Sequence, residues 1–222
     1  MPYTNAEPDI QVHLAQPQDK AQSRTLIVAV TGASGSIFAM ELLRALEADE
    51  RVDKVELVVS PSALRVLAEE AGGTGRRGLL ERLLPHSVNH SSKIHLLEHD
   101  DIGAPIASGS YPTAGMIVLP CSMGTLAAIA NGLANGLIAR AADVTLKERR
   151  PIILCVRETP FNRIHLRNMT LAADAGAVIF PVIPAFYNKP MDSTEMARQF
   201  VFRVLAHICL PQPRAYVWKA DE

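Results

Sequence analysis

The sequence contains few cysteines, and their spacing matches no metal-binding or redox motif. Cys121, Cys155 and Cys209 are odd in number, and no CxxC or CxxH pair occurs. Two of the three lie in or beside apolar runs, where reduced, buried thiols are the ordinary case in a cytosolic protein. This pattern argues against both a disulfide framework and a cysteine-based metal site.

Long apolar runs and an excess of basic charge are also missing. No stretch reaches the ~20 apolar residues that cross a bilayer, and residues 176–186 are interrupted by Pro181 and Pro184. The formal net charge is -1, whereas proteins that mainly bind nucleic acid carry a basic field. Residues 1–24 are polar and lack the apolar core of a secretory signal, so we expect a flexible tail. These absences predict a soluble, cytoplasmic protein that binds neither membrane nor nucleic acid.

The length of the chain and its alternating strand and helix patterns predict one α/β domain. The chain has 222 residues, of which 48% are hydrophobic, enough for a substantial core. Continuous apolar runs, typical of strands covered on both faces, alternate with helical patterns. The predicted strands cover residues 25–31, 54–60, 115–120, 151–156 and 177–180. Without repeats or a linker, this alternation predicts a single-domain, doubly wound parallel sheet over residues 25–222. Residues 72–112 are the least regular part, and 72–78 read as a flexible, basic loop.

Small hydroxyl residues and glycines follow three of these strands. The first strand is followed by Gly32-Ala33-Ser34-Gly35, the second by Ser60, and the third by Ser122-Met123-Gly124-Thr125. Carboxyl ends of parallel strands meet at one sheet edge, where helix N-termini favour a phosphate or a flavin. Ser60 and Ser122 equally fit as helix N-caps, and tight turns between strand and helix are common. The repetition at three strands favours a binding edge.

A charged block surrounds the next predicted strand. Arg140, Asp143 and Lys147 share one face of a helix predicted over residues 137–150, and Glu158 follows the strand at 151–156. Asp143 and Lys147 also fit a routine i,i+4 ion pair. Charged residues just past a buried strand are where open α/β sheets bind ligands, so the block is a candidate site.

Four histidines, His86, His90, His95 and His99, fall close together in the irregular part. Their spacings lack a carboxylate or cysteine in a recognised ligand pattern, which favours surface histidines over a metal site. The prediction is therefore that no metal is bound.

Five motifs resemble the UbiX-type flavin prenyltransferases, formerly described as aromatic acid decarboxylase subunits. These motifs are 30–35 (VTGASG), 119–125 (LPCSMGT), 140–151 (RAADVTLKERRP), 157–160 (RETP) and 184–187 (PAFY). The resemblance runs from about Leu26 to Trp218, and the 140–151 block is highly specific. Residues 36–39 (SIFA) depart from the family's frequent Ala-x-Tyr-Gly, and Pro61 replaces a frequent lysine. Neither departure removes a residue assigned to chemistry.

The resemblance implies a flavodoxin-like (Rossmann-like) fold, a dodecamer and a metal-independent transferase. Dimethylallyl monophosphate would donate its prenyl group to N5 and C6 of reduced FMN, and a UbiD-type decarboxylase would receive the prenylated FMN. Carried over by motif, FMN contacts fall on Gly32, Ala33, Ser34, Ser60, Ser122, Gly124, Thr125 and Arg140. Ligands of the prenyl phosphate fall on Lys147, Tyr187 and Arg203. The implied catalytic residues are Ser34, Glu70, Lys147, Glu158 and Trp218.

The residue types suit this chemistry. Cleaving an allylic C–O bond leaves phosphate and a delocalised cation, so cationic and hydroxyl donors are needed at the leaving group. Aromatic faces such as that of Trp218 steady the cation. Closing the new ring releases a flavin proton, for which Glu158 or the departing phosphate is an acceptor.

Two other functions stay open at this point. A related flavin-dependent cysteine decarboxylase would carry a PASANT motif and an early catalytic histidine. This chain has PCSMGT at 120–125 and no histidine between residues 34 and 85. A non-catalytic FMN-binding or delivery protein would need Ser34, Ser122 and Arg140, but not Lys147 or Glu158.

Overall fold

The sheet is built from the apolar runs that the sequence predicts. The computed structural model describes residues 24–72, 75–83 and 93–219. Within them, the strands are β1 (Thr25–Val30), β2 (Lys54–Val59), β3 (Ile94–Leu97), β4 (Gly115–Cys121), β5 (Ile152–Val156) and β6 (Val178–Ile179). They form one sheet in the order β3-β2-β1-β4-β5-β6, and every neighbouring pair is parallel. Strands β1, β4 and β5 are buried along their whole length, because helices cover both faces.

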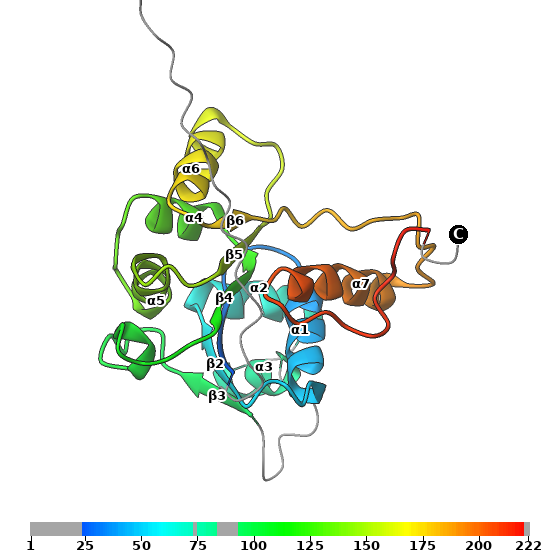
Figure 1. Cartoon of the computed structure of the whole chain (residues 1–222), viewed down its shortest axis with the longest axis horizontal. Helices are drawn as coiled ribbons and strands as arrows, with labels where there is room; N and C mark the ends of the chain where they lie inside the picture. The colour runs from blue at the N-terminus through cyan, green and yellow to red at the C-terminus, as the bar shows by residue number, and fades with distance from the viewer. Residues whose placement is uncertain (1–23, 73–74, 84–92, 220–222) are drawn as a thin grey trace, which may run out of the picture.

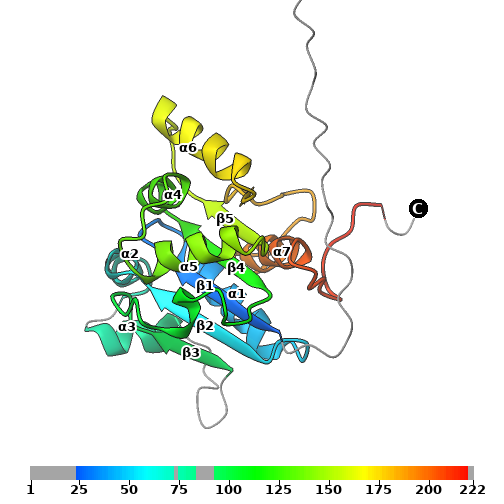
Figure 2. The same cartoon turned by 60° about the vertical axis from the view of Figure 1, so that its left-hand side comes forward.

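Helices lie on both faces of this sheet (Figures 1 and 2). They are α1 (Ser36–Ala48), α2 (Pro61–Ala71), α3 (Arg76–Leu83), α4 (Met123–Ala130), α5 (Leu137–Lys147), α6 (Arg163–Asp174) and α7 (Ser193–Ala206). One core cluster joins the sheet to α1, α2, α3 and α7, and a second joins it to α4, α5 and α6. The single-domain α/β fold with a doubly wound parallel sheet is therefore confirmed.

The strand order reverses between β1 and β4, which neighbour each other although β2 and β3 lie between them in sequence. Helices starting after β1 and after β4 cover opposite faces, α1 in one core cluster and α4 in the other. In open α/β sheets such a reversal opens a crevice outside the carboxyl ends of the strands. The turns after β1 and β4 therefore border the expected ligand crevice.

Residues 72–112 contain short elements that the sequence prediction did not include. The loop predicted over residues 72–78 is shorter, because α3 begins at Arg76. The edge strand β3 and a 3-10 helix at Pro105–Ala107 also form in this stretch. Strand β3 has only four residues and pairs with β2 alone, and two of its side chains are exposed, so its apolar pattern is weak. Two predicted helices also end earlier, at Lys147 and Ala206.

The remaining predictions concern the N-terminal tail, the histidines and contact with a membrane. The predicted tail lies outside the described residues except for Arg24, and so do His86 and His90. In the part that the structure describes, no helix combines the length and apolar character needed to cross a membrane.

Candidate functional site

A single threonine ties together the turns that follow β1 and β4. The Thr31 hydroxyl donates to the carbonyl of Pro120 at 2.8 Å and accepts from the backbone N–H of Ser122 at 2.8 Å. Thr31 is 1% exposed, so this exchange is shielded from water and holds both turns in register. The glycine turn at 32–35 and the hydroxyl turn at 122–125 therefore lie side by side at the carboxyl edge, as the sequence predicted.

Glu70 reaches back from the end of α2 to the start of α1. Its carboxylate accepts from the backbone N–H of Gly35 at 2.8 Å and of Ser36 at 2.7 Å. Partial burial raises the pKa of Glu70, but hydrogen bonds from Ser34, Ser36 and Gly35 outweigh it, so the pKa lies below its ordinary value. A carboxylate of the protein itself thus occupies the positive end of α1, a place where anions often bind.

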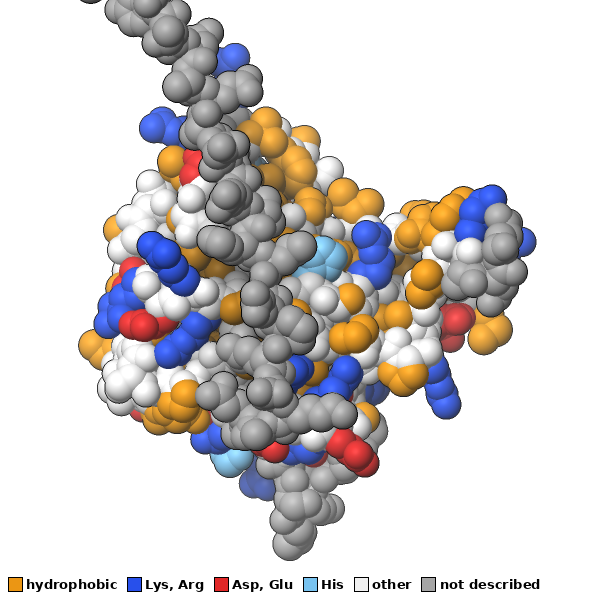
Figure 3. Space-filling model, viewed as in Figure 1, with side chains coloured by type: hydrophobic (Ala, Val, Ile, Leu, Met, Phe, Trp, Pro, Cys, Tyr) orange, Lys and Arg blue, Asp and Glu red, His pale blue; other side chains and the backbone are white. Residues whose placement is uncertain are grey.

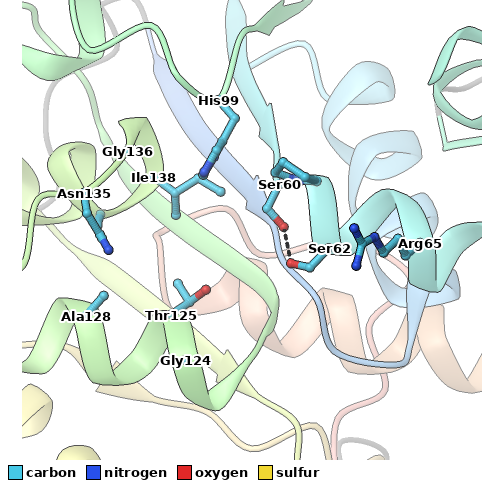
Figure 4. Close-up of a pocket in the computed structure, with 12 residues that line it drawn as sticks. Ser60, Ser62, Arg65, His99, Gly124, Thr125, Ala128, Asn135, Gly136 and Ile138 are labelled. Carbon is cyan, nitrogen blue, oxygen red and sulfur yellow. Dashed lines mark hydrogen bonds between the residues drawn. The ribbon is translucent and has the colours of Figure 1, made fainter.

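An open cavity of about 440 Å³ lies between α2, α4 and the start of α5 (Figure 4). The predicted flavin contacts Ser60, Gly124 and Thr125 line it. Ser60 and Ser122 cap α2 and α4 as predicted, accepting from the N–H groups of Ala63 and Thr125. Two helix N-termini with their hydroxyl caps therefore meet at the cavity, which suits a phosphate.

Gly32 allows the first turn to approach α2 closely. A Cβ at Gly32 would lie 2.5 Å from the Cβ of Ser62, a distance that no real side chain tolerates. The hydroxyls of Ser60 and Ser62 lie 3.0 Å apart. Gly32 therefore brings the turn after β1 against the hydroxyl-lined wall of the cavity.

Four polar residues that line the cavity were missed by sequence reasoning: Ser62, Arg65, His99 and Asn135. Ser62 and Arg65 lie three residues apart on α2, just after its cap Ser60, so a search of the helix face that they share would have found them. His99 and Asn135 belong to loops, and nothing in their local sequence shows that they meet here.

Glu158 lies at the same edge, just after β5. The backbone N–H of Arg157 donates to the carbonyl of Cys121 at 3.1 Å, which holds the chain beside the turn after β4. The exposed Glu158 carboxylate accepts from the N–H of Thr159 at 2.9 Å. By contrast, burial raises the pKa of the neighbouring Cys121 to about 12, so this thiol stays protonated and is no nucleophile.

The cations of α5 lie elsewhere in the chain. Arg140 donates from Nε to the carbonyl of Ala107 at 3.1 Å and from Nη1 to Asp143 at 2.7 Å. The simple alternative, an Asp143–Lys147 pair, does not form, because Lys147 pairs with Glu148. Lys147 is the last residue of α5. At about 1.5 Å per residue it lies roughly 16 Å along the helix from Gly136, which borders the cavity.

The remaining predicted residues belong to α7 and to a C-terminal arm, defined here as residues 181–191 and 211–219, which extends beside α7 (Figure 1). The Tyr187 ring lies 5.2 Å from the Trp218 ring, and both residues are exposed. Arg203 on α7 lies 5.9 Å from the Phe180 ring and borders the same small hollow as Tyr187.

Within one chain, the predicted residues therefore fall into three groups according to their place in the structure. The carboxyl edge holds Gly32, Ala33, Ser34, Ser60, Glu70, Ser122, Gly124, Thr125 and Glu158. The outer face of α5 holds Arg140 and Lys147, and the arm with α7 holds Tyr187, Arg203 and Trp218. Among the described residues, no hydrogen bond or ion pair joins a residue of one group to a residue of another.

Known proteins provide an independent comparison. The Flavoprotein family model matches residues 14–203. The flavin prenyltransferase UbiX of Salmonella typhimurium is 47% identical over 192 residues, which cover 86% of this chain and 94% of that protein.

Two solved structures are similar along nearly their whole length. A dodecameric FMN-dependent UbiX-like decarboxylase from Escherichia coli O157:H7 has a TM-score of 0.77 at 39% identity, over 88% of this chain and all of that one. AnUbiX (PadA1), in complex with FMN and dimethylallyl pyrophosphate, has a TM-score of 0.75 at 38% identity, over 90% of this chain and all of that one. The chain therefore belongs to the flavoprotein family and, within it, to the UbiX flavin prenyltransferases.

Proposed function

We propose that this protein transfers a dimethylallyl group from a dimethylallyl phosphate to N5 and C6 of reduced FMN. The observation that carries the proposal is the carboxyl edge of the sheet. Two helix N-termini with hydroxyl caps and a glycine turn meet there beside a cavity of about 440 Å³. This edge belongs to a chain that is 47% identical to a flavin prenyltransferase.

The residues at this edge fit FMN. Ser60, Gly124 and Thr125 are proposed to hold its phosphate in the cavity, where backbone N–H groups and hydroxyls converge. Gly32, Ala33, Ser34 and Ser122 would lie along the ring system, because the glycine turn allows a close approach of the backbone. The reduced flavin supplies the nucleophilic N5 and C6 atoms, and the protein supplies position, charge and proton transfer.

Proton handling is proposed for Glu158, Ser34 and Glu70, which all belong to the carboxyl edge of the sheet. Glu158 is proposed to accept the proton that ring closure releases. Ser34 would relay or orient that proton, since its hydroxyl is fixed by a hydrogen bond to Glu70. Glu70 therefore acts on the site by holding Ser34 and the start of α1 in place.

The donor phosphate needs the other two groups of residues. Lys147, Tyr187 and Arg203 are proposed to bind it. Together with Arg140, which the family motifs assign to FMN, they would stabilise the charge that the phosphate gains as the C–O bond breaks. Trp218 would face the allylic cation and exclude water, which would otherwise trap it.

These groups lie apart within one chain, so we propose that the site is completed between copies in a homo-oligomer. Exposed apolar residues of the arm, including Ile183, Phe186, Met191 and Trp218, form a surface that suits such contacts. Figure 3 shows hydrophobic side chains along the projecting arm. A dodecamer, as named for the Escherichia coli O157:H7 structure, is the proposed assembly. A UbiD-type decarboxylase is the proposed recipient of the product.

An anaerobic assay tests the reaction. The protein is incubated with reduced FMN and either dimethylallyl monophosphate or the diphosphate, and the released flavin is analysed by mass spectrometry. We expect a gain of one C5 unit together with free phosphate or diphosphate. Tightly bound but unmodified FMN with both donors would contradict the transferase and favour an FMN-delivery protein.

Complementation tests whether the site is shared between copies. Ser34→Ala and Lys147→Ala are each expected to be inactive alone. Co-expressed in mixed oligomers, they should regain activity, because some sites would combine Ser34 of one copy with Lys147 of another. If the mixed oligomers stay inactive, both residues act within the same chain.

A further inference from the structure

The cavity between α2, α4 and α5 contains two groups that no step above uses. Arg65 projects from α2, and His99 projects from the loop after β3. Figure 4 shows the His99 imidazole extending into the cavity between Gly136 and Ser60. Both groups face the region assigned above to the FMN phosphate.

His99 is held at the start of α5. Its carbonyl accepts from the backbone N–H of Leu137 at 2.9 Å. A Cβ at Gly136 would lie 3.1 Å from Nε2 of the imidazole, and Gly136 has a φ of +137°, which a residue with a side chain rarely adopts. The glycine therefore leaves room for the ring, and the backbone bond fixes the ring at the cavity wall.

His99 also has unmet hydrogen-bonding capacity. Its Nδ1 atom is buried and has no partner among the described residues, whereas buried polar atoms nearly always have one. Arg65 is the one permanently charged side chain among the cavity-lining residues described, and none of these is acidic. The acidic residues Glu98 and Asp100 flank His99 along the chain but do not line the cavity.

The other charged groups of the surrounding elements are engaged elsewhere. Arg140, one turn into α5, donates to Ala107 and Asp143. Asp101, in the His99 loop, accepts from the N–H of Gly103 at 3.0 Å. The cavity therefore combines a fixed cation, a titratable imidazole and two helix N-termini, a set of groups suited to an anion.

We propose that His99, together with Arg65, makes the site select flavins with a terminal phosphate monoester, and that the His99 contribution depends on pH. The inference rests on the proposed function, because it concerns the phosphate of the flavin substrate. His99 and Arg65 are then the residues that make the site bind FMN in preference to riboflavin.

Charge gives this selection its pH dependence. A phosphate monoester carries about -1.5 to -2 charges at pH 7, and histidine side chains change charge between about pH 5 and 8. A protonated imidazole donates a charge-assisted hydrogen bond, which is stronger than a neutral one. Arg65 keeps its charge throughout this range, so its contribution should vary little with pH.

The test compares FMN with riboflavin by quenching of flavin fluorescence at pH 6.5 and pH 8. Wild type, His99→Gln and Arg65→Gln are titrated beside the control His95→Gln, which changes an exposed histidine of β3 outside the cavity. We expect His99→Gln to lower the ratio of FMN to riboflavin affinity about tenfold at pH 6.5, from loss of one charge-assisted bond, and much less at pH 8. Arg65→Gln should lower the ratio at both pH values. His95→Gln should match wild type.

The phosphate's own titration occurs in every variant, so only the difference between wild type and His99→Gln reports on the histidine. An unchanged ratio in His99→Gln, with riboflavin affinity preserved as a check of folding, would overturn the inference. If wild type then still prenylates FMN, the proposed function stands without it. If His99→Gln lowers the ratio of FMN to riboflavin affinity as expected but wild type makes no C5 adduct, the transferase proposal fails and this inference stands.

Discussion

The carboxyl edge of the sheet and the C-terminal arm differ in what holds their residues in place. At the edge, Thr31 and Ser60 are 1% and 7% exposed. Thr31 is fixed by a hydrogen bond to the carbonyl of Pro120, and Ser60 by the bond that it accepts from the N–H of Ala63 as the cap of α2. In the arm, Tyr187 and Trp218 are 51% and 60% exposed, and their rings contact aromatic residues of the arm itself.

This difference separates two kinds of functional residue. The edge is positioned by the fold of one chain, so its geometry should survive in an isolated subunit. The arm presents aromatic and cationic groups on an exposed surface, so they gain a defined place only against another surface. The comparison therefore predicts that changes at the edge affect chemistry, whereas changes in the arm affect donor binding and assembly.

The largest effect is expected at the edge, from Glu158→Gln. If this carboxylate accepts the flavin proton, its loss should slow product formation by about 10²–10⁴-fold. FMN affinity should change little, because the exposed carboxylate lies outside the cavity. Single-turnover product formation and FMN titration measure the two effects separately. The matched control is Glu69→Gln, an exposed glutamate on α2, and normal turnover by Glu158→Gln would remove Glu158 from the mechanism.

A smaller effect, of another kind, is expected from Arg203→Ala. Losing one charged donor to the prenyl phosphate should weaken donor binding by about 10- to 100-fold, while FMN binding stays intact. Donor-concentration dependence of product formation measures this. Arg167→Ala, at an exposed arginine of α6 outside the arm, serves as the control. An unchanged donor dependence in Arg203→Ala would argue that α7 contributes packing alone.

The sequence predicts the edge better than the arm for a physical reason. Strands β1, β4 and β5 are covered on both faces, so burial demands continuous apolar runs that are visible in the sequence. Parallel pairing then places the turns after these strands at one edge. Ser34, Ser60 and Ser122 could be grouped on that basis alone.

Features that depend on tertiary packing were not predictable in this way. His99 enters the cavity because the loop after β3 packs on Gly136, and β3 itself leaves only a weak apolar pattern. The family motifs identified Lys147 and Tyr187, but a motif does not say which copy of the chain delivers a residue. The separation of these residues from the edge became visible only in three dimensions.

Low pH should moderately reduce the free energy of unfolding by weakening the contacts of Asp49 and Arg51 with the start of the 211–219 segment. Hydrogen bonds from Arg51, followed by one from Gln212, outweigh burial and lower the pKa of Asp49 to about 2, and Arg51 also donates to the carbonyl of Pro211. A lowered folded-state pKa gives stability that is present above about pH 4 and is lost as the pH falls toward 2. Asp49→Asn should therefore cost on the order of 2 kcal/mol at pH 7 and little near pH 2.

Urea unfolding at the two pH values measures this difference. The control is Asp174→Asn, at an exposed aspartate near the end of α6, which should behave like wild type at both. A cost for Asp49→Asn that is equal at both pH values would contradict the ionic origin of the stabilisation and leave only packing.

The smallest effect is expected from removal of metal ions. If Lys147, Tyr187 and Arg203 neutralise the leaving phosphate, a divalent cation has no charge left to balance, and EDTA should not change product formation from the monophosphate donor. Inhibition with both donors would mean that α5 and α7 supply too little positive charge, and it would reopen a metal role for the histidines. Inhibition with the diphosphate donor alone would mean that the protein's cations suffice for a monophosphate but not for the larger charge of a diphosphate, which identifies the donor that the site fits.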